Sequence, residues 1–256
     1  MYNNSRSLRS SWEGVWQTLD VENAHNDVLR NDASTNTMAY RPIIRRVLNQ
    51  YERPNVLEAG CGLGQWLYYI AKTTNGTATG LDLAEDALSR VSVSETLSPF
   101  IKSKRVALQV GDMRSTPFDN STFNLIFSFG VIEHVVDKDS ARTIAEFARL
   151  LRPNGRLLVT TPNKFAMHSL TRPILQATGN WTVGFERSLT CKQLRNHVIH
   201  AGLEAEEYGV LDTGQLFGAV LTKRIKALEA WSHWIESRQK LFGFISYCIG
   251  RKATNL

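Results

Sequence analysis

The chain has 256 residues, 43% of them hydrophobic and 21% charged, which suits one globular α/β domain spanning 1–256. Its formal net charge of +6 could indicate an anionic partner, but lysines and arginines are scattered along the chain, so a solvated basic face explains the charge better than nucleic-acid binding does. Its 3 cysteines are widely spaced and form no Cys-x-x-Cys pair, which argues against a disulfide framework and against a zinc site.

The N-terminal segment is polar. Residues 1–10 contain no apolar run that could act as a signal peptide, and the most apolar later stretch, 241–249, is shorter than the roughly 20 residues that a membrane span needs. We therefore expect a cytoplasmic protein with no transmembrane segment. Trp12 and Trp16 have the spacing of one helical face, so their packing would staple an N-terminal helix to the body of the protein.

A strand, a glycine turn and a helix follow one another near residue 60. Residues 38–50 have helical spacing of apolar side chains and lead into a short buried strand at 56–57. Glycines at alternate positions precede a second helical pattern that begins at Gln65; they are Gly60, Gly62 and Gly64. Glycine allows positive φ and close approach of a ligand to the backbone, and the helix start offers unpaired N–H groups. Glu58, just before the turn, is unfavourable for a pyrophosphate but suits a ligand with an ammonium group.

Acidic residues follow the next two predicted strands. The segment 77–82 reads as a strand that ends in Asp82, about twenty residues past the glycines, where a carboxylate can accept both hydroxyls of a ribose. The alternative is helix capping, because Asp82 and Glu85 have the spacing of a capping box. The strand predicted at 105–110 is followed by Asp112 and by Met113.

The predicted fourth strand, 123–129, leads into Glu133 and His134. Ligands lie at the carboxyl ends of strands in open parallel sheets, so both side chains are expected near the chemistry. His134 could act as a base or orienting group. It could equally pack on the following helix and bond the backbone.

The second half of the chain alternates predicted elements with two long insertions. Thr190 and Gln193 have the spacing of a capping box at the start of a helix. The predicted elements are a helix at 138–151, a strand at 156–161, the helix from 190 to 200, and strands at 203–210 and 244–251. The insertions are 164–188 and 211–243, and the second contains an aromatic, basic helix.

The acidic residue followed by Gly-x-Gly-x-Gly resembles the first motif of the class I S-adenosylmethionine-dependent methyltransferases. Further motif matches run in order from Val56 to Asn163, including a Leu-x-Pro-x-Gly segment before the fifth strand. The resemblance implies an α/β fold with a seven-stranded, Rossmann-like, doubly wound sheet that is mostly parallel with an antiparallel last strand, plus helical lid insertions. It also implies an N-terminal helical or lid segment at 1–50, a cofactor-binding core at 51–163 and an acceptor-side half at 164–256.

By the same resemblance the cofactor is S-adenosyl-L-methionine. The glycine loop would wrap its methionine end, Glu58 would help hold the amino group and Asp82 would bind the ribose. Leu83 would lie against the adenine, Asp112 would accept from its amino group, and Met113 would pack on the ring. The complete set of expected cofactor-binding residues is Glu58, Gly60, Cys61, Gly62, Gln65, Asp82, Leu83, Asp112, Met113 and Phe129, and the expected catalytic residues are Glu133 and His134. Trp12 and Trp16 become candidates for a lid.

Two motifs that are absent from the chain limit the classes of acceptor molecule that we expect. Nucleic-acid amino methyltransferases of this fold carry an Asn/Asp-Pro-Pro-aromatic segment where this chain has 128–131, so no nucleic-acid partner is expected. Some quinone methyltransferases bind a metal through Glu-x-x-Glu-His, but Gly130 takes the first position here, so no metal is expected. We predict transfer to a small-molecule or lipid- or sugar-linked acceptor at oxygen or nitrogen. The alternatives are a non-catalytic cofactor-binding protein and a nucleotide-cofactor oxidoreductase.

The insertions 164–188 and 211–243 are expected to cover the acceptor, because long connections near the ligand edge are often functional. Their aromatic residues would give apolar cover; they are Phe165, Trp181, Phe185, Trp231 and Trp234. Their cations could hold an anionic or lipid-linked acceptor; they are Arg172, Arg187, Lys223 and Arg224. Peripheral membrane contact fits this reading, and the alternative is a homodimer interface that uses the same aromatic residues.

Overall fold

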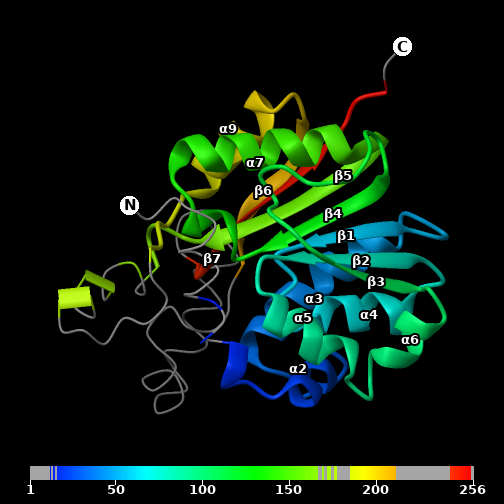
Figure 1. The fold of residues 1–256 in the computed structure, drawn as a ribbon. Helices are drawn as coiled ribbons and strands as arrows, with labels where there is room; N and C mark the ends of the chain where they lie inside the picture. The colour runs from blue at the N-terminus through cyan, green and yellow to red at the C-terminus, as the bar shows by residue number, and fades with distance from the viewer. Residues whose placement is uncertain are drawn as a thin grey trace.

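A single twisted sheet organises the molecule (Figure 1). The computed structural model describes residues 16–166, 185–211 and 243–254, together with Trp12, Gly14, Ser169, Arg172, Pro173, Gln176 and Ala177. The strands are β1 (Asn55–Ala59), β2 (Thr77–Asp82), β3 (Val106–Val110), β4 (Phe123–Phe129), β5 (Leu151–Pro162), β6 (Glu204–Leu211) and β7 (Ile245–Arg251). They form a 7-stranded sheet in the order β3-β2-β1-β4-β5-β7-β6.

Strand directions confirm the predicted mostly parallel sheet with an antiparallel last strand. β1 pairs in parallel with β2 and β4, β2 with β3, and β4 with β5. β7 is antiparallel to both neighbours, β5 and β6, so the last strand of the chain lies inside the sheet and β6 forms the edge. The strand order reverses between β1 and β4. In sheets of this kind the crevice for a ligand opens at that reversal.

Helices cover both faces of the sheet, as doubly wound folds require (Figure 1). They are α2 (Val21–Asp27), α3 (Thr35–Leu48), α4 (Gln65–Thr73), α5 (Glu85–Ser92), α6 (Ser98–Lys102), α7 (Asp137–Leu150) and α9 (Cys191–His200), with a 3-10 turn η1 (Ile132–His134). The apolar faces of α2, α3, α4 and α5 pack into one core cluster, and those of α7 and α9 into another. Central strands read as continuous apolar runs because both of their faces are buried, as in β4 at Leu125, Ile126 and Phe127.

Most predicted elements have the predicted bounds, and β5 is the main exception. The prediction placed this strand at 156–161, with 152–155 as the end of the preceding helix. In the structure α7 ends at Leu150 and β5 begins at once, with its pairing to β4 shifting between Phe123 and Leu125. Asn154 has a φ of 62°, and a Cβ on Gly155 would lie 2.7 Å from the carbonyl oxygen of Arg152. The segment is therefore an irregular start to the strand rather than a loop.

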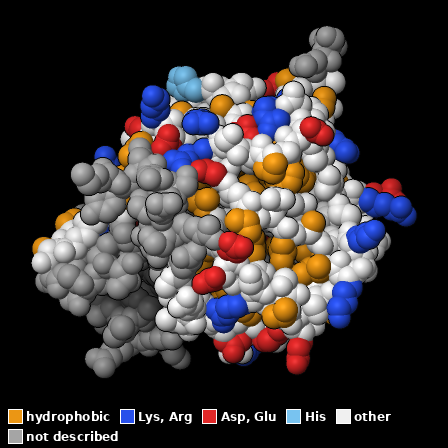
Figure 2. All heavy atoms as spheres, in the orientation of Figure 1, with side chains coloured by type: hydrophobic (Ala, Val, Ile, Leu, Met, Phe, Trp, Pro, Cys, Tyr) orange, Lys and Arg blue, Asp and Glu red, His pale blue; other side chains and the backbone are white. Residues whose placement is uncertain are grey.

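The expected helix within 211–243 lies outside the described residues, and the proposed division at 50 and 163 remains a prediction. No helix among the described residues is long and apolar enough to cross a membrane. On the face drawn in Figure 2, acidic and basic side chains are interspersed. That distribution agrees with a solvated charged face on this side of the molecule.

Candidate active site

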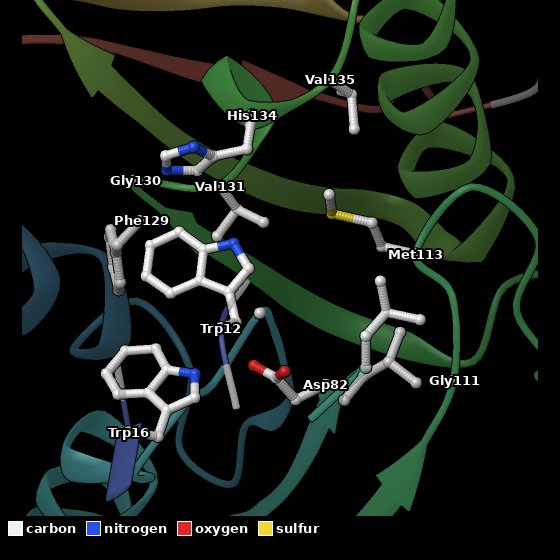
Figure 3. Close-up of a pocket in the computed structure, with 13 residues that line it drawn as sticks. Trp12, Trp16, Asp82, Gly111, Met113, Phe129, Gly130, Val131, His134 and Val135 are labelled. Carbon is white, nitrogen blue, oxygen red and sulfur yellow. The ribbon is translucent and has the colours of Figure 1, made fainter. Parts of the chain in front are cut away.

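A cavity of about 110 Å³ opens at the carboxyl ends of β1, β2 and β4 (Figure 3). Its lining brings together five of the predicted cofactor residues, which are Gly60, Asp82, Leu83, Met113 and Phe129. The predicted catalytic His134 lines the same cavity. Residues from four segments of the chain therefore meet at the point where the strand order reverses.

The glycine turn is shaped by close packing. Gly60 has a φ of +79°, and a Cβ there would lie 2.4 Å from a methyl group of Val131. Gly62 has a φ of +49°, and a Cβ there would lie 2.7 Å from the ring of Trp16. The N–H groups of Gly60 and Cys61 both donate to the carbonyl of Leu81, at 2.8 and 3.1 Å. Only glycine combines this conformation with this space, so the loop geometry is determined by the motif itself.

Glu58 lies near the end of β1 with 3% of its surface exposed. Its Oε2 is buried and has no hydrogen-bond partner among the described residues. Burial raises the pKa of this carboxyl well above its usual range, and a backbone hydrogen bond from Leu67 opposes the shift. An orphaned carboxylate oxygen beside the glycine turn is suited to an ammonium group of a ligand.

Asp82 ends β2, and its carboxylate points into the cavity toward the indole rings of Trp12 and Trp16 (Figure 3). Oδ2 accepts from the N–H of Gly62 at 2.8 Å, and Oδ1 accepts from the N–H of Ala84 at 2.9 Å. Helix α5 has Ala84 as its N-cap without a side-chain cap bond, so the capping-box alternative is wrong. Burial raises the pKa of Asp82, while these backbone bonds lower it. Each oxygen keeps a lone pair that can accept from a ribose hydroxyl.

The residues after β3 divide between the cavity and the protein surface beside it. Met113 lines the cavity with Leu83, as expected for side chains against an adenine ring. Asp112 instead forms an ion pair with Arg114, whose Nη2 lies 2.6 Å from its Oδ2. Arg114 also lies 3.1 Å from Asp139. The contact predicted between Asp112 and an adenine amino group would therefore have to share the Asp112 carboxylate with Arg114.

Cys61 is buried, and its Sγ lies 2.8 Å from where a Cβ of Gly80 would be. Burial raises the pKa of its thiol well above the usual range, so the thiol stays protonated. The Cys61 side chain thus packs inside the loop and does not line this cavity. Any contact between Cys61 and the cofactor would come from the Cys61 backbone. This favours the interpretation of Cys61 as a small residue over that of a reactive thiol.

A second cavity of about 340 Å³ adjoins the first, and Phe129 and Gly130 line both. Gln65, predicted to bind the methionine end of the cofactor, lines this second cavity. So does Glu133, which the sequence placed near the chemistry. The two predicted catalytic residues, which are adjacent in the chain, therefore face different cavities.

His134 lies at the cavity and also bonds the backbone. It lines the first cavity, with its ring 4.7 Å from that of Trp12, and its Nδ1 lies 2.9 Å from the carbonyl oxygen of Phe185. A carbonyl only accepts, so Nδ1 carries the proton and Nε2 carries a lone pair in the neutral ring. Burial lowers the pKa of His134, which favours that neutral form. The base role remains a prediction.

Glu133 has 2% of its surface exposed, and its Oε2 has no hydrogen-bond partner among the described residues. Its Oε1 lies 4.0 Å from Nε2 of His134. Burial raises the pKa of Glu133 well above its usual range. Within the described part of the chain, no group of three or more His, Cys, Asp or Glu side chains could hold a metal ion, and the expectation of no metal remains a prediction.

Trp12 and Trp16 stack on each other with ring centroids 5.4 Å apart, and both line the first cavity. Arg90 of α5 donates to the carbonyls of Trp16 and Leu19, the latter at 2.6 Å. Contact with the cavity is what the lid interpretation predicts, and attachment to α5 is what the staple interpretation predicts. Trp16 makes both contacts, and Trp12 contacts the cavity.

His25 of α2 is a site residue that sequence analysis missed. It is fully buried, its ring stacks on Tyr68 at 5.4 Å, and its Nε2 lies 2.6 Å from the carbonyl oxygen of Leu63 in the glycine turn. Nδ1 lies 2.5 Å from Oγ1 of Thr96, which can donate to it. The neutral ring with a proton on Nε2 satisfies all of these groups, and burial lowers its pKa accordingly. Its only sequence signal is the helical spacing that it shares with Val21 and Val28.

The described part of the first insertion contacts the site through Phe185 and its neighbours. Arg172 pairs with Glu186 at 3.1 Å, and Arg187 donates to the carbonyl of Val135 and to Oγ of Ser140, at 3.1 and 2.7 Å. Arg172 and Arg187, two of the four cations proposed for an anionic acceptor, are thus bonded within the protein. Phe165 is 42% exposed. The remaining predicted cover residues lie outside the described residues; they are Trp181, Lys223, Arg224, Trp231 and Trp234.

Comparison with known families identifies the class of domain. Residues 56–155 match the sequence profile of a family described as "Methyltransferase domain". This match covers β1 to the start of β5, which includes the glycine turn, Asp82 and the residues after β4. Residues 56–155 therefore have the sequence of a methyltransferase domain, and the cofactor of the similar proteins is S-adenosylmethionine.

Named relatives agree with this assignment. The chain is 31% identical over 122 residues to a probable S-adenosylmethionine-dependent methyltransferase of Mycolicibacterium smegmatis, covering 48% of this chain and 43% of that protein. It is 31% identical over 134 residues to nocamycin O-methyltransferase of Saccharothrix syringae (50% and 46%), and 23% identical over 158 residues to ajmaline N-methyltransferase of Rauvolfia serpentina (57% and 53%). The matches thus span about half the length of these curated relatives.

Solved structures share the fold. An example is 1,6-didemethyltoxoflavin-N1-methyltransferase of Burkholderia thailandensis, determined with 1,6-didemethyltoxoflavin and S-adenosylhomocysteine bound. Its TM-score is 0.58 at 16% identity, over 84% of this chain and 78% of that one. The similarity supports the Rossmann-like architecture, and the acceptor has to be argued from this chain's own residues.

Proposed function

We propose that the protein transfers the methyl group of S-adenosylmethionine to a small-molecule or lipid- or sugar-linked acceptor, at an oxygen or a nitrogen atom. The observation that carries the proposal is the meeting of two cavities at the carboxyl ends of the strands. One is bordered by Asp82 and the other by Glu133, and Phe129 and Gly130 belong to both. Methyl transfer needs a donor site and an acceptor site in contact, and two adjoining cavities support that assignment.

The residues present fit the cofactor. Glu58 offers an unpartnered carboxylate oxygen to its ammonium group, and Asp82 offers lone pairs to its ribose hydroxyls. When bound, S-adenosylmethionine supplies a methyl group on a sulfonium, which an acceptor atom can displace in line. The protein then has to align acceptor and donor, and alignment can contribute about 7–11 kcal/mol to such a bimolecular step.

Cofactor binding tests the proposal most directly. We expect calorimetry with S-adenosylhomocysteine to show a one-to-one complex, and NAD⁺ to bind far more weakly. Methyl transfer is then followed as S-adenosylhomocysteine formed from S-adenosylmethionine with a panel of hydroxyl and amine acceptors. Tighter binding of NAD⁺ than of S-adenosylhomocysteine would support an oxidoreductase instead. Tight cofactor binding without turnover on any acceptor would support a non-catalytic binding protein.

His134 is proposed as the group that accepts the acceptor's proton, through the lone pair on Nε2. Loss of a general base lowers turnover by about 10²–10⁴-fold. We therefore expect His134→Ala to lower the turnover number on a hydroxyl acceptor most strongly near neutral pH, with exposed His200→Ala as the control. A turnover number that stays intact from about pH 6 to pH 9 would show that the base role is wrong.

A further inference from the structure

Among the described residues, the lining of the second cavity combines an apolar wall with one carboxyl group. Its aromatic lining includes Tyr40, Trp66 and Phe129. The ring of Tyr40 lies 6.2 Å from that of Trp66 and 5.1 Å from that of Phe129, so the three rings form one continuous wall. Glu133 is the acidic side chain of the lining. A ligand here would place an apolar body against the rings and a polar group toward Glu133.

The charges around Glu133 leave it without a cation of its own. Glu186 is the nearby carboxylate that raises the pKa of Glu133, and it pairs with Arg172. Arg187 is the nearby cation, but its guanidinium is bonded to Val135, Ser140 and Asp137. The Tyr40 hydroxyl, also close to Glu133, lies 3.1 Å from Oγ1 of Thr160. A cationic ligand would therefore meet a carboxylate that the described residues have not neutralised.

Once Glu133 is ionised, as an adjacent ammonium group favours, Glu133 and His134 form a pair of acceptors with no donor from the described residues between them. The Nδ1–H group of His134 donates a hydrogen bond to the carbonyl oxygen of Phe185, so Nε2 is an acceptor. Nε2 lies 4.0 Å from Oε1 of Glu133. A single nitrogen can lie within hydrogen-bond distance of both atoms, at about 2.7–3.2 Å from each. That nitrogen must donate twice. A primary amine or its ammonium form can do so, whereas a hydroxyl donates only once.

We propose that the acceptor is a small primary amine with an apolar body. Its nitrogen lies where the two cavities adjoin, between Glu133 of the second and His134 of the first, while the rings of Tyr40, Trp66 and Phe129 hold the rest in the second cavity. The inference rests on the proposed methyl transfer and specifies its substrate class. Aromatic faces attract cations, and burial strengthens the attraction. The cavity volume of about 340 Å³ is in the range of small-molecule sites.

The chemistry balances with the groups at hand. An ammonium has no lone pair, so one of its protons first moves to Nε2 of His134. The freed lone pair on nitrogen forms a bond to the methyl carbon, the carbon–sulfur bond breaks, and its electron pair stays on sulfur as a thioether. The product is a methylated ammonium, which Glu133 can still pair with. The proton on His134 returns to solvent when the product leaves.

The test compares amines with alcohols of the same skeleton in the complex with S-adenosylhomocysteine. The probes are 2-phenylethylamine, 2-phenylethanol and N,N-dimethyl-2-phenylethylamine, with the matched hexyl series, all measured by calorimetry. We expect each primary amine to bind at least about tenfold more tightly than its alcohol, because its hydrogen bonds are charge-assisted. The dimethylamine carries one N–H when charged, so it should bind less tightly than the primary amine.

Variants assign the preference to Glu133. Glu133→Gln should reduce the ratio of amine affinity to alcohol affinity to about the value expected for a site without a charged group. Glu52→Gln, at an exposed position away from the cavity, should leave this affinity ratio unchanged. The comparison within the native protein does not depend on whether the variant folds. Equal binding of amine and alcohol, a ratio that survives in Glu133→Gln, or no binding by any amine would overturn the inference. Methyl transfer to alcohols in that case would leave the proposed function intact, whereas loss of S-adenosylhomocysteine binding would remove both.

Discussion

The two cavities at the carboxyl edge of the sheet are built in different ways. The first is made mainly by residues at and just after the ends of β1, β2, β3 and β4, with Trp12 and Trp16 added from the N-terminal segment, and its key carboxylate, Asp82, already accepts two backbone bonds. The second is assembled from positions as far apart as Ser34 and Ile245, and the Oε2 of its carboxylate, Glu133, has no bond among the described residues. The first site is thus shaped largely by local backbone geometry, and the second by tertiary packing around a buried carboxyl group.

The largest effect should come from breaking the glycine turn. Gly60→Ala places a Cβ against Val131 at 2.4 Å and in a left-handed conformation, whereas Gly202→Ala has a similar φ of +82° with nothing within 4 Å. Conformation alone costs about 1–2 kcal/mol, and overpacking adds about 1–3 kcal/mol. Urea unfolding should therefore show a larger loss for Gly60→Ala, with loss of cofactor binding for that variant only. Equal losses of unfolding free energy in the two variants would mean that the Val131 side chain moves away from the new methyl group at little cost.

Asp82→Ala should come next, because it removes both the predicted ribose contacts and two bonds that hold the loop. Each hydrogen bond to a charged group contributes about 1.5–3 kcal/mol before water compensates. We expect calorimetry to show much weaker S-adenosylhomocysteine binding, together with a lower melting temperature of the free protein. Exposed Asp119→Ala provides the control. An unchanged dissociation constant would refute the ribose assignment.

His25→Phe tests the difference between the two cavities, because His25 supports the glycine turn of the first cavity without lining that cavity. Phenylalanine can keep the stacking on Tyr68 but leaves the Leu63 carbonyl and Thr96 hydroxyl without their partner. A buried polar group left unpaired costs about 1–3 kcal/mol. We expect a lower free energy of unfolding and weaker S-adenosylhomocysteine binding, with amine binding in the second cavity changed less. Equal weakening of both ligands would indicate a general loss of packing.

The smallest expected effect is the pH dependence of stability. Burial lowers the folded-state pKa of His25 and His134 below 6.5, so the unfolded chain takes up protons first as the pH falls. Their contribution to stability is therefore complete above 6.5 and is lost as the pH falls from there through the folded pKa. Glu58 and Glu133, with raised pKa values, act in the opposite direction. Urea unfolding from about pH 8 to pH 5 should show a smaller loss in His25→Phe than in the native protein.

Local patterns predicted the framework because their causes are local. The glycine turn follows from backbone sterics within a few residues, and the strands and helices follow from apolar periodicity. For this reason β2 begins and ends at the predicted residues, and α4 begins at the predicted residue. Asp82 could be identified because a strand end fixes where its side chain emerges. The start of β5 was missed because its irregular backbone depends on pairing with β4, which no local pattern reports.

Tertiary structure alone decided how the site is completed. The Phe185 carbonyl that sets the proton on His134, the His25 ring that bonds the Leu63 carbonyl, and the ring of Tyr40 in the second cavity all come from distant segments. The sequence by itself determined most of the individual strands, the glycine turn and the class of domain, because residues close in the chain make those features. Only folding could decide which of Glu133 and His134 faces which cavity and what surrounds them, because such contacts depend on how whole helices and strands pack together.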